Sequence, residues 1–285
     1  MSKLLKFLFY FVIPTSALFV VVISYLAVCK LVFPYDVLLK NGKTVLEIAE
    51  NIRPEILQRK DTKPVFFRTK DNLKLSGYLL KRKNPIANLL VCHGYQSCKE
   101  FSKDIIELFS NYNILLFDFR AHGQSEGKYR TLGCHEYKDV IAAANFFKNN
   151  TKDYKNNLPL IILGTSMGGS TAIKALEYEP NLCNAIVLDS AFASLKSVIY
   201  NAFKYKANLP AYPFLPIAEK MTNFLASCNV GTMCPLENIK SVKQPILFIH
   251  SCIDEIVPPN DSLLMYANGI NKNNKIWIAK LAPHS

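Results

Sequence analysis

The longest apolar segment of the chain runs from Phe7 to Cys29 and contains no charged residue. Lys3 and Lys6 precede it, and Lys30 follows it. At a rise of about 1.5 Å per residue, a helix of this length crosses the roughly 30 Å hydrocarbon layer of a bilayer, whereas the apolar core of a cleavable signal peptide has only about 7–15 residues. The pattern predicts a single-pass transmembrane anchor within residues 1–34.

Residues 35–61 carry apolar side chains at helical spacing, among them Val45, Ala49 and Ile52. This spacing predicts a short helical neck that Pro54 breaks. The pattern then changes at about residue 62, and we expect a globular domain over residues 62–285.

Within this domain, short apolar runs alternate with amphipathic stretches, which is typical of a mostly parallel sheet with crossover helices. We expect about eight strands, the first two forming a hairpin: 64–69, 73–80, 87–92, 114–119, 159–163, 185–189, 245–250 and 275–279. We expect helices between them at 100–110, 136–149, 166–178 and 261–267. The predicted fold class is α/β.

One connection, about residues 191–242, is too long for a plain crossover. Its middle is rich in proline (Pro210, Pro213 and Pro216), and it contains many aromatic residues. Long insertions in compact domains are often lids or binding loops, so we interpret this one as a small helical cap over an active site. Some of its aromatic side chains would simply pack the insertion onto the core.

Composition limits the functions to consider. Half of the residues are hydrophobic, which supports a buried core. The formal net charge is +12, but the lysines are scattered among asparagines and form no dense stripe. We therefore expect a solvated surface with weak attraction to anionic lipids, and no nucleic-acid partner.

The eight cysteines show no C-x-x-C spacing, so neither a zinc site nor a thioredoxin-like redox motif is predicted. Cys228 and Cys234 are close enough in sequence to form a disulfide in an oxidising compartment. Free buried thiols are the simpler interpretation. No cluster of side chains has metal-ligand spacing, and no metal or cofactor is expected.

A candidate nucleophile lies in the motif Gly164-Thr165-Ser166-Met167-Gly168, directly after a predicted buried strand and before a predicted helix. This G-x-S-x-G context places a serine on a sharp turn at the carboxyl edge of a sheet. The helix N-terminus adds favourable potential for a developing oxyanion. The strand and helix on either side make the motif far more specific than its five residues alone.

Such a serine needs a base and an acid that orients the base, in the chain order Ser, acid, His. Asp254 follows the strand predicted at 245–250, and His284 follows the last strand. The neighbouring Glu255 competes for the acid role but is expected to face solvent. These positions predict Ser166, Asp254 and His284 as the catalytic residues.

The other histidines fit structural roles better. His93 follows a strand in the sequence His93-Gly94-Tyr95, and we interpret it as a neighbour of the oxyanion site. The backbone N–H groups of Tyr95 and Met167 are then the expected oxyanion donors. His122, His135 and His250 are expected to be loop or core histidines with local hydrogen bonds.

Five motifs in this order resemble the α/β-hydrolase superfamily, and more narrowly its membrane-anchored Bem46-like and serine-aminopeptidase-like (S33-type) branch. They are His93-Gly94-Tyr95, 117–127, 164–169, Leu188-Asp189-Ser190 and the Asp254 loop, and the resemblance covers about residues 62–285. The resemblance implies the same three catalytic residues and oxyanion donors, and cofactor-free hydrolysis of an ester, thioester or amide.

The sequence departs from this family in two places. His250-Ser251 stands where the family usually has His-Gly. The sequence also stops one residue after His284, whereas relatives continue with a helix that steadies the histidine loop. A mobile His284 would impair catalysis, because small misplacements of a catalytic group can cost about 100-fold in rate.

Two classes of function remain open at this point. The first is a serine hydrolase that cleaves an acyl or lipid-like small molecule through an acyl-enzyme; a peptidase or thioesterase would use the same chemistry. The second is a catalytically impaired, membrane-tethered binding module. The basic tail before the first apolar helix favours a cytoplasmic N-terminus and a catalytic domain on the non-cytoplasmic side. Oligomeric state is not predicted.

Overall fold

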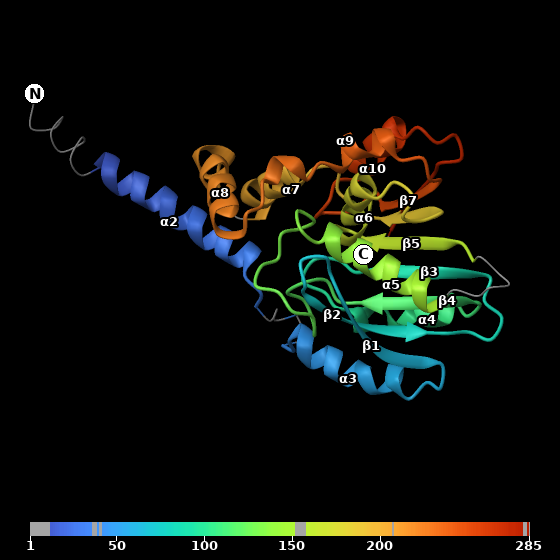
Figure 1. The fold of residues 1–285 in the computed structure, drawn as a ribbon. Helices are drawn as coiled ribbons and strands as arrows, with labels where there is room; N and C mark the ends of the chain where they lie inside the picture. The colour runs from blue at the N-terminus through green and yellow to red at the C-terminus, as the bar shows by residue number, and fades with distance from the viewer. Residues whose placement is uncertain are drawn as a thin grey trace, which may run out of the picture.

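The computed structural model describes residues 12–35, 39, 42–151, 158–206, 208–281 and 284. In this part of the chain, eight strands form one sheet in the order β1-β2-β4-β3-β5-β6-β7-β8 (Figure 1). β2 pairs antiparallel with β1 and β4, and the remaining neighbours pair in parallel. The strands are β1 (Thr62–Arg68), β2 (Lys74–Leu80), β3 (Ala87–Cys92), β4 (Tyr112–Phe117), β5 (Leu160–Thr165), β6 (Ala185–Asp189), β7 (Ile246–Ser251) and β8 (Lys275–Ala279).

Helices cover both faces of the sheet because successive side chains of a strand point to opposite faces. In β3, Leu89 and Val91 belong to a core cluster with Ile56 and Ile106, which come from α3 (Val45–Leu57) and α4 (Lys103–Leu108). Leu90 and Cys92 point the other way, into the larger core that contains α5 (Tyr137–Thr151) and α6 (Met167–Tyr178). A short 3-10 helix, η2 (Lys99–Ser102), precedes α4, and α10 (Pro259–Asn268) lies between β7 and β8.

This architecture confirms the predicted α/β fold with a mostly parallel eight-stranded sheet. Each predicted strand overlaps an observed one, and the ends differ by at most two residues. The expected break at Pro54 is wrong, because α3 continues through this residue to Leu57. Pro54 lies in the last turn, where its missing N–H removes one helical hydrogen bond, while the Thr44–Glu47 capping box and the buried Ile56 stabilise the helix.

The neck helix α3 packs directly on the domain. Arg53 pairs with the buried Glu100 at 3.3 Å, and Glu100 also accepts a hydrogen bond from the Tyr78 hydroxyl at 2.6 Å. The preceding residue, Lys99, has a fully buried ammonium group 2.6 Å from Oδ2 of Asp118. These paired charges connect α3 to η2, and η2 to the residue that follows β4.

The apolar N-terminal segment forms α2 (Ile13–Val32), which is long and apolar enough to cross a membrane. The predicted span begins at Phe7, so its first residues lie outside the described part of the chain. α2 extends away from the domain, and most of its side chains are exposed (Figure 1). Ser24, Val28 and Val32 are buried, and they mark the side of the helix that faces the rest of the protein.

The connection from β6 to β7 is helical, and its longest helix, α8, lies beside α2 (Figure 1). It consists of α7 (Leu195–Asn201), the π-helical turn η3 (Ala202–Lys206), α8 (Ala211–Ala226), η4 (Val230–Thr232), α9 (Pro235–Asn238) and η5 (Ile239–Ser241). Its aromatic side chains divide as expected: Phe192, Phe203 and Phe214 are buried in the core, whereas Tyr212 and Phe224 are exposed. We refer to residues 191–242 as the cap.

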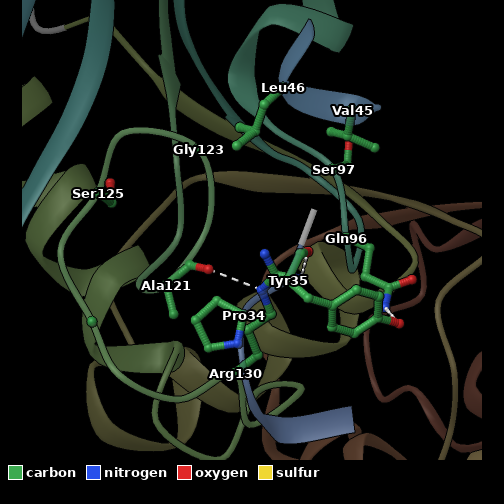
Figure 2. A pocket seen from close by; sticks show the side chains of 11 residues that line it. Pro34, Tyr35, Val45, Leu46, Gln96, Ser97, Ala121, Gly123, Ser125 and Arg130 are labelled. Atoms are coloured by element: carbon green, nitrogen blue, oxygen red, sulfur yellow. Dashed lines mark hydrogen bonds between the residues drawn. The ribbon is translucent and has the colours of Figure 1, made fainter. Parts of the chain in front are cut away.

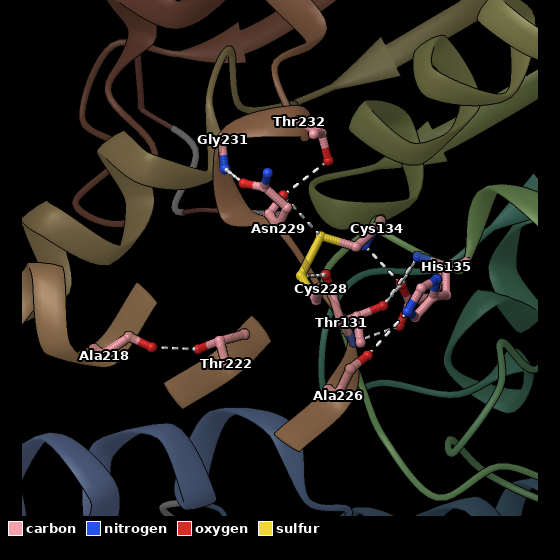
Figure 3. The surroundings of a disulfide bond; sticks show 12 residues. Thr131, Cys134, His135, Ala218, Thr222, Ala226, Cys228, Asn229, Gly231 and Thr232 are labelled. Carbon is pink, nitrogen blue, oxygen red and sulfur yellow. Dashed lines mark hydrogen bonds between the residues drawn. A yellow bond between two sulfur atoms is a disulfide. The ribbon is translucent and has the colours of Figure 1, made fainter. Parts of the chain in front are cut away.

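A disulfide links the cap to the body of the protein. Cys228, two residues after α8, is bonded to Cys134, which lies just before α5 (Figure 3). Neither expectation for Cys228 was right: it is not a free thiol, and its partner is not Cys234, which is free. The error has a physical cause, because 94 residues separate the bonded cysteines and only the tertiary fold brings their Cα atoms to 5.7 Å.

Candidate active site

Ser166 occupies a sharp turn between β5 and α6. Its backbone has φ 50° and ψ −115°, a conformation that is costly for a residue other than glycine. The turn is fixed by hydrogen bonds on both sides: Ser166 N donates to Asp189 O at 2.7 Å, and Ser170 N donates to Ser166 O at 3.1 Å. This arrangement presents the hydroxyl at the carboxyl edge of the sheet.

Two glycines allow the turn to be this tight. A Cβ atom on Gly164 would lie 2.5 Å from the Cα of Gly169, and one on Gly168 would overlap the carbonyl group of Cys92. Both contacts are with backbone atoms, which cannot move aside. The G-x-S-x-G pattern is therefore required by the packing of α6 against β3 and β5.

Asp254 lies in the loop after β7, and its side chain is fully buried. Oδ1 accepts hydrogen bonds from the backbone N–H groups of Ile256 and Val257, at 2.8 and 2.9 Å. Burial would raise the pKa of Asp254, but hydrogen bonds from His250, His284 and these backbone groups outweigh it and hold the pKa well below its ordinary value. The carboxylate is therefore ionised at neutral pH.

His284 lies between Asp254 and Ser166. Its Nδ1 is 2.6 Å from Oδ2 of Asp254, and its Nε2 is 3.1 Å from Oγ of Ser166. An ionised carboxylate only accepts hydrogen bonds, so Nδ1 carries the proton and Nε2 is left as the acceptor that faces the serine hydroxyl. The three residues predicted from the sequence thus meet at one edge of the sheet, although 118 residues separate Ser166 from His284.

A second histidine, His250, also contacts the acid. Its fully buried Nε2 lies 3.2 Å from Oδ2 of Asp254 and 3.0 Å from Val257 O, and its Nδ1 lies 2.7 Å from the hydroxyl of Ser262. Burial would lower the pKa of His250, but the hydrogen bonds to Asp254 and Val257 outweigh it and raise the pKa.

His250 was expected to be a loop or core histidine with local hydrogen bonds, and its contact with Asp254 was not predicted. The signal that could have identified it is the i, i+4 spacing to Asp254 around the end of a strand.

Glu255, the competing acid, is exposed, as expected. The expected oxyanion donors flank Ser166. Met167 is the first residue of α6 and is fully buried, and backbone N–H groups in the first turn of a helix have no partner within the helix. On the other side, a Cβ atom on Gly94 would lie 3.8 Å from the Cβ of Ser166, so the loop that carries Tyr95 passes close to the serine.

His93 holds this loop in place. Its Nδ1 lies 2.7 Å from Gly94 O, and its Nε2 accepts a hydrogen bond from Phe119 N at 3.1 Å. Burial is the main cause that lowers the pKa of His93, so the ring is neutral. His122 is also buried with a lowered pKa, and Nε2 of His135 lies 3.0 Å from Ala226 O in the cap. Neither contacts the serine.

A cavity of about 250 Å³ lies on the neck side of the Tyr95 loop (Figure 2). Tyr35, Leu46, Gln96 and Arg130 are among its lining residues, and Arg130 Nε donates to Ala121 O at 2.9 Å. The three residues of the candidate site do not line it. Among the described residues, no group of three or more His, Cys, Asp or Glu side chains is placed to hold a metal ion.

The strand order, the serine turn and the Ser-His-Asp chain of hydrogen bonds define the architecture of an α/β hydrolase. Comparison with known proteins agrees. A family model described as serine aminopeptidase, S33, matches residues 83–227, which is about half of the chain. The chain therefore belongs to the serine aminopeptidase S33 family, a family of hydrolases.

Curated relatives of this chain include three proteins from bacteria and fungi. It is 30% identical over 199 residues to the uncharacterized protein YqkD of Bacillus subtilis, covering 67% of this chain and 63% of YqkD. It is 24% identical over 221 residues to the uncharacterized membrane protein YNL320W of Saccharomyces cerevisiae, covering 76% and 71%. It is 25% identical over 206 residues to the protein bem46 of Schizosaccharomyces pombe, covering 70% and 62%. The Bem46-like resemblance is thereby confirmed.

Among solved structures, the chain is similar to the Pyrococcus furiosus esterase Pf2001. The two share 31% sequence identity with a TM-score of 0.63, over 78% of this chain and 83% of the esterase. This similarity supports a hydrolase.

Proposed function

We propose that this protein is a membrane-anchored serine hydrolase that cleaves an ester or related acyl bond through an acyl-enzyme. The observation that supports this most is the position of His284, which lies within hydrogen-bond distance of both Asp254 and Ser166. A serine hydroxyl is a weak nucleophile unless a base accepts its proton as it attacks. The imidazole of His284, with Nε2 facing the hydroxyl, can act as such a base.

In the proposed reaction, Oγ of Ser166 attacks the acyl carbon while its proton moves to Nε2 of His284. Asp254 remains ionised and stabilises the resulting imidazolium through Nδ1. The negative charge on the acyl oxygen accepts hydrogen bonds from the N–H groups of Tyr95 and Met167, each worth about 3 kcal/mol of barrier in comparable sites.

The imidazolium then donates its proton to the leaving alcohol, and the acyl group stays on Ser166. A water molecule, deprotonated by His284, attacks the acyl-enzyme in the second half. The carboxylic acid leaves, and the serine regains its proton. No electron transfer and no further reactant are needed. Thioester and peptide bonds could be cleaved by the same steps; the similarity to an esterase favours the ester.

Residues 1–34 would anchor this domain in a membrane, with the hydrolase domain on the non-cytoplasmic side. The disulfide between Cys134 and Cys228 supports this orientation, because such bonds persist in oxidising compartments and are rare in the cytosol. A reporter fused to the C-terminus, active only on one side of the membrane, tests it. Reporter activity in the cytoplasm would refute the orientation and leave the proposed chemistry untouched.

A fluorophosphonate probe tests the enzymatic proposal, because it reacts only with an activated serine. Full-length protein in detergent is expected to be labelled, and Ser166→Ala to lose all labelling. Ser97→Ala, in the nearby Tyr95 loop, is the matched control and should be labelled like the parent. Well-folded parent protein that takes up no probe would instead favour the membrane-tethered binding module.

A further inference from the structure

The anchor helix and the cap line an apolar cavity of about 140 Å³ that is open on one side. Ala27 and Leu31 of α2 form one wall, and Phe203 of η3 and Ala218 of α8 lie among the residues of the other. Thr222 is the single lining residue with a polar side chain, and its hydroxyl donates to Ala218 O at 2.8 Å (Figure 3). The cavity therefore offers almost no free hydrogen-bonding group, and it suits a hydrocarbon.

Tyr95 connects this cavity to the candidate active site. Its hydroxyl donates to Leu31 O at 2.7 Å, at the domain end of α2, and Leu31 lines the cavity. The neighbouring residue, Gly94, lies against Ser166. Two consecutive residues, Gly94 and Tyr95, thus contact the serine turn and the anchor helix, so the loop that borders Ser166 also reaches the helix that lines the cavity.

The cavity lies beside the C-terminal part of the helix that is long and apolar enough to cross a membrane. The hydroxyl of Ser24 contacts Phe214 O of α8 at 3.3 Å, so the cap touches α2 well inside the uncharged segment. Ser24 precedes Lys30 by six residues, which is about 9 Å along a helix. A membrane that surrounds α2 would therefore also meet α8, whose exposed side carries Phe224.

Resting on the proposed function, we propose that the cavity between α2 and the cap binds the hydrocarbon chain of a membrane lipid whose ester carbonyl lies at Ser166. An empty apolar cavity of about 150 Å³ can hold a benzene molecule, so this one accepts a few methylene groups. The remaining length of a fatty acyl chain would continue along the exposed apolar side of α2 into the bilayer. The anchor helix is then part of the substrate site as well as a tether.

The substitution Ala27→Leu tests this directly, because it fills the cavity from the anchor helix with a residue suited to lipid. The measurement is kcat/KM of the full-length protein in phosphatidylcholine nanodiscs for p-nitrophenyl esters from acetyl to decanoyl. Each buried methylene adds about fourfold to kcat/KM. Ala27→Leu is expected to lower the decanoyl-to-acetyl ratio by about tenfold or more. Ala17→Leu, the same change at an exposed position of α2, is expected to leave the ratio unchanged.

A second measurement separates this proposal from the first. Ser166→Ala protein in the same nanodiscs would be irradiated with a phosphatidylcholine that carries a diazirine on its acyl chain. Crosslinks to α7, α8 and the C-terminal half of α2 that Ala27→Leu reduces would support the lipid site, whether or not the protein hydrolyses esters. A ratio unchanged by Ala27→Leu, or crosslinks confined to the N-terminal half of α2, would overturn it. The lipid site would also be ruled out if the protein cleaved a peptide amide with a higher kcat/KM than every ester in the series.

Discussion

The role of Asp254 makes the sharpest quantitative prediction. In the parent protein, Oδ1 accepts two backbone N–H groups, and Oδ2 faces Nδ1 of His284 and Nε2 of His250. Asp254→Asn keeps the shape but replaces one oxygen by an NH2 group. The remaining oxygen has to face the two backbone donors, because an NH2 group there would meet two N–H groups. The NH2 group therefore faces His284.

This orientation reverses the tautomer of His284. Nδ1 now has to accept a hydrogen bond from the amide, so the ring proton moves to Nε2, which faces Ser166 and can no longer take its proton. In enzymes with this arrangement, the wrong tautomer lowers kcat by about 10⁴, or about 5.5 kcal/mol of barrier. We expect a loss of the same order for ester hydrolysis by Asp254→Asn.

The assay is the steady-state kcat for p-nitrophenyl butyrate at pH 7.5, with circular dichroism to verify folding. Asp261→Asn is the matched control, because Asp261 is a buried carboxylate that accepts a backbone hydrogen bond from Ala193 at 2.9 Å, and the substituted amide can still accept it. Its kcat should stay within a few-fold of the parent. A folded Asp254→Asn protein with kcat within tenfold of the parent would refute the assigned role of the acid.

Three further predictions concern stability. The pKa of Asp254 is lower in the folded protein than its unfolded value of about 3.9. The ionised carboxylate therefore stabilises the fold fully above about pH 3.9, and this stabilisation is lost as the pH falls towards the folded pKa. The difference in urea midpoint between the parent and Asp254→Asn should shrink from pH 6 to pH 3. Lys99→Met leaves the buried Asp118 carboxylate without its 2.6 Å ion pair and should lower the free energy of unfolding by about 3 kcal/mol, measured by urea denaturation; an unchanged midpoint would contradict the pairing. Cys134→Ser should lower the free energy of unfolding by about 2–4 kcal/mol in oxidised protein and leave that of reduced protein unchanged. Equal effects in both would rule out the disulfide.

Much of the fold could be predicted from the sequence because its strands are short, apolar and separated by clear turns. β3 and β5 are nearly continuous apolar runs, as expected of strands covered on both faces. The serine turn could be located as well, since the glycines at 164 and 168 are required by local backbone contacts. Local patterns of this kind are visible in a single sequence.

Contacts that no motif marks could not be predicted. The partner of Cys228 is 94 residues away, and nothing near either cysteine marks the pair. The contact of His250 with Asp254 has one signal in the sequence, the i, i+4 spacing around the end of β7, and an ordinary buried histidine can show the same spacing. The packing of the cap against α2 was not predicted either, because a segment that is apolar all round is expected to contact lipid on every side. The buried Ser24 shows that one side faces protein.

In the proposed mechanism, Ser166 forms a covalent acyl intermediate with the help of His284. Rapid acid quenching of full-length protein during turnover of p-nitrophenyl butyrate, followed by mass spectrometry of its peptides, tests this most directly. We expect a butyryl group on the peptide that contains Ser166, absent in Ser166→Ala and strongly reduced in His284→Ala. Butyrate release that continues in Ser166→Ala, with no acylated peptide at any time point, would contradict it.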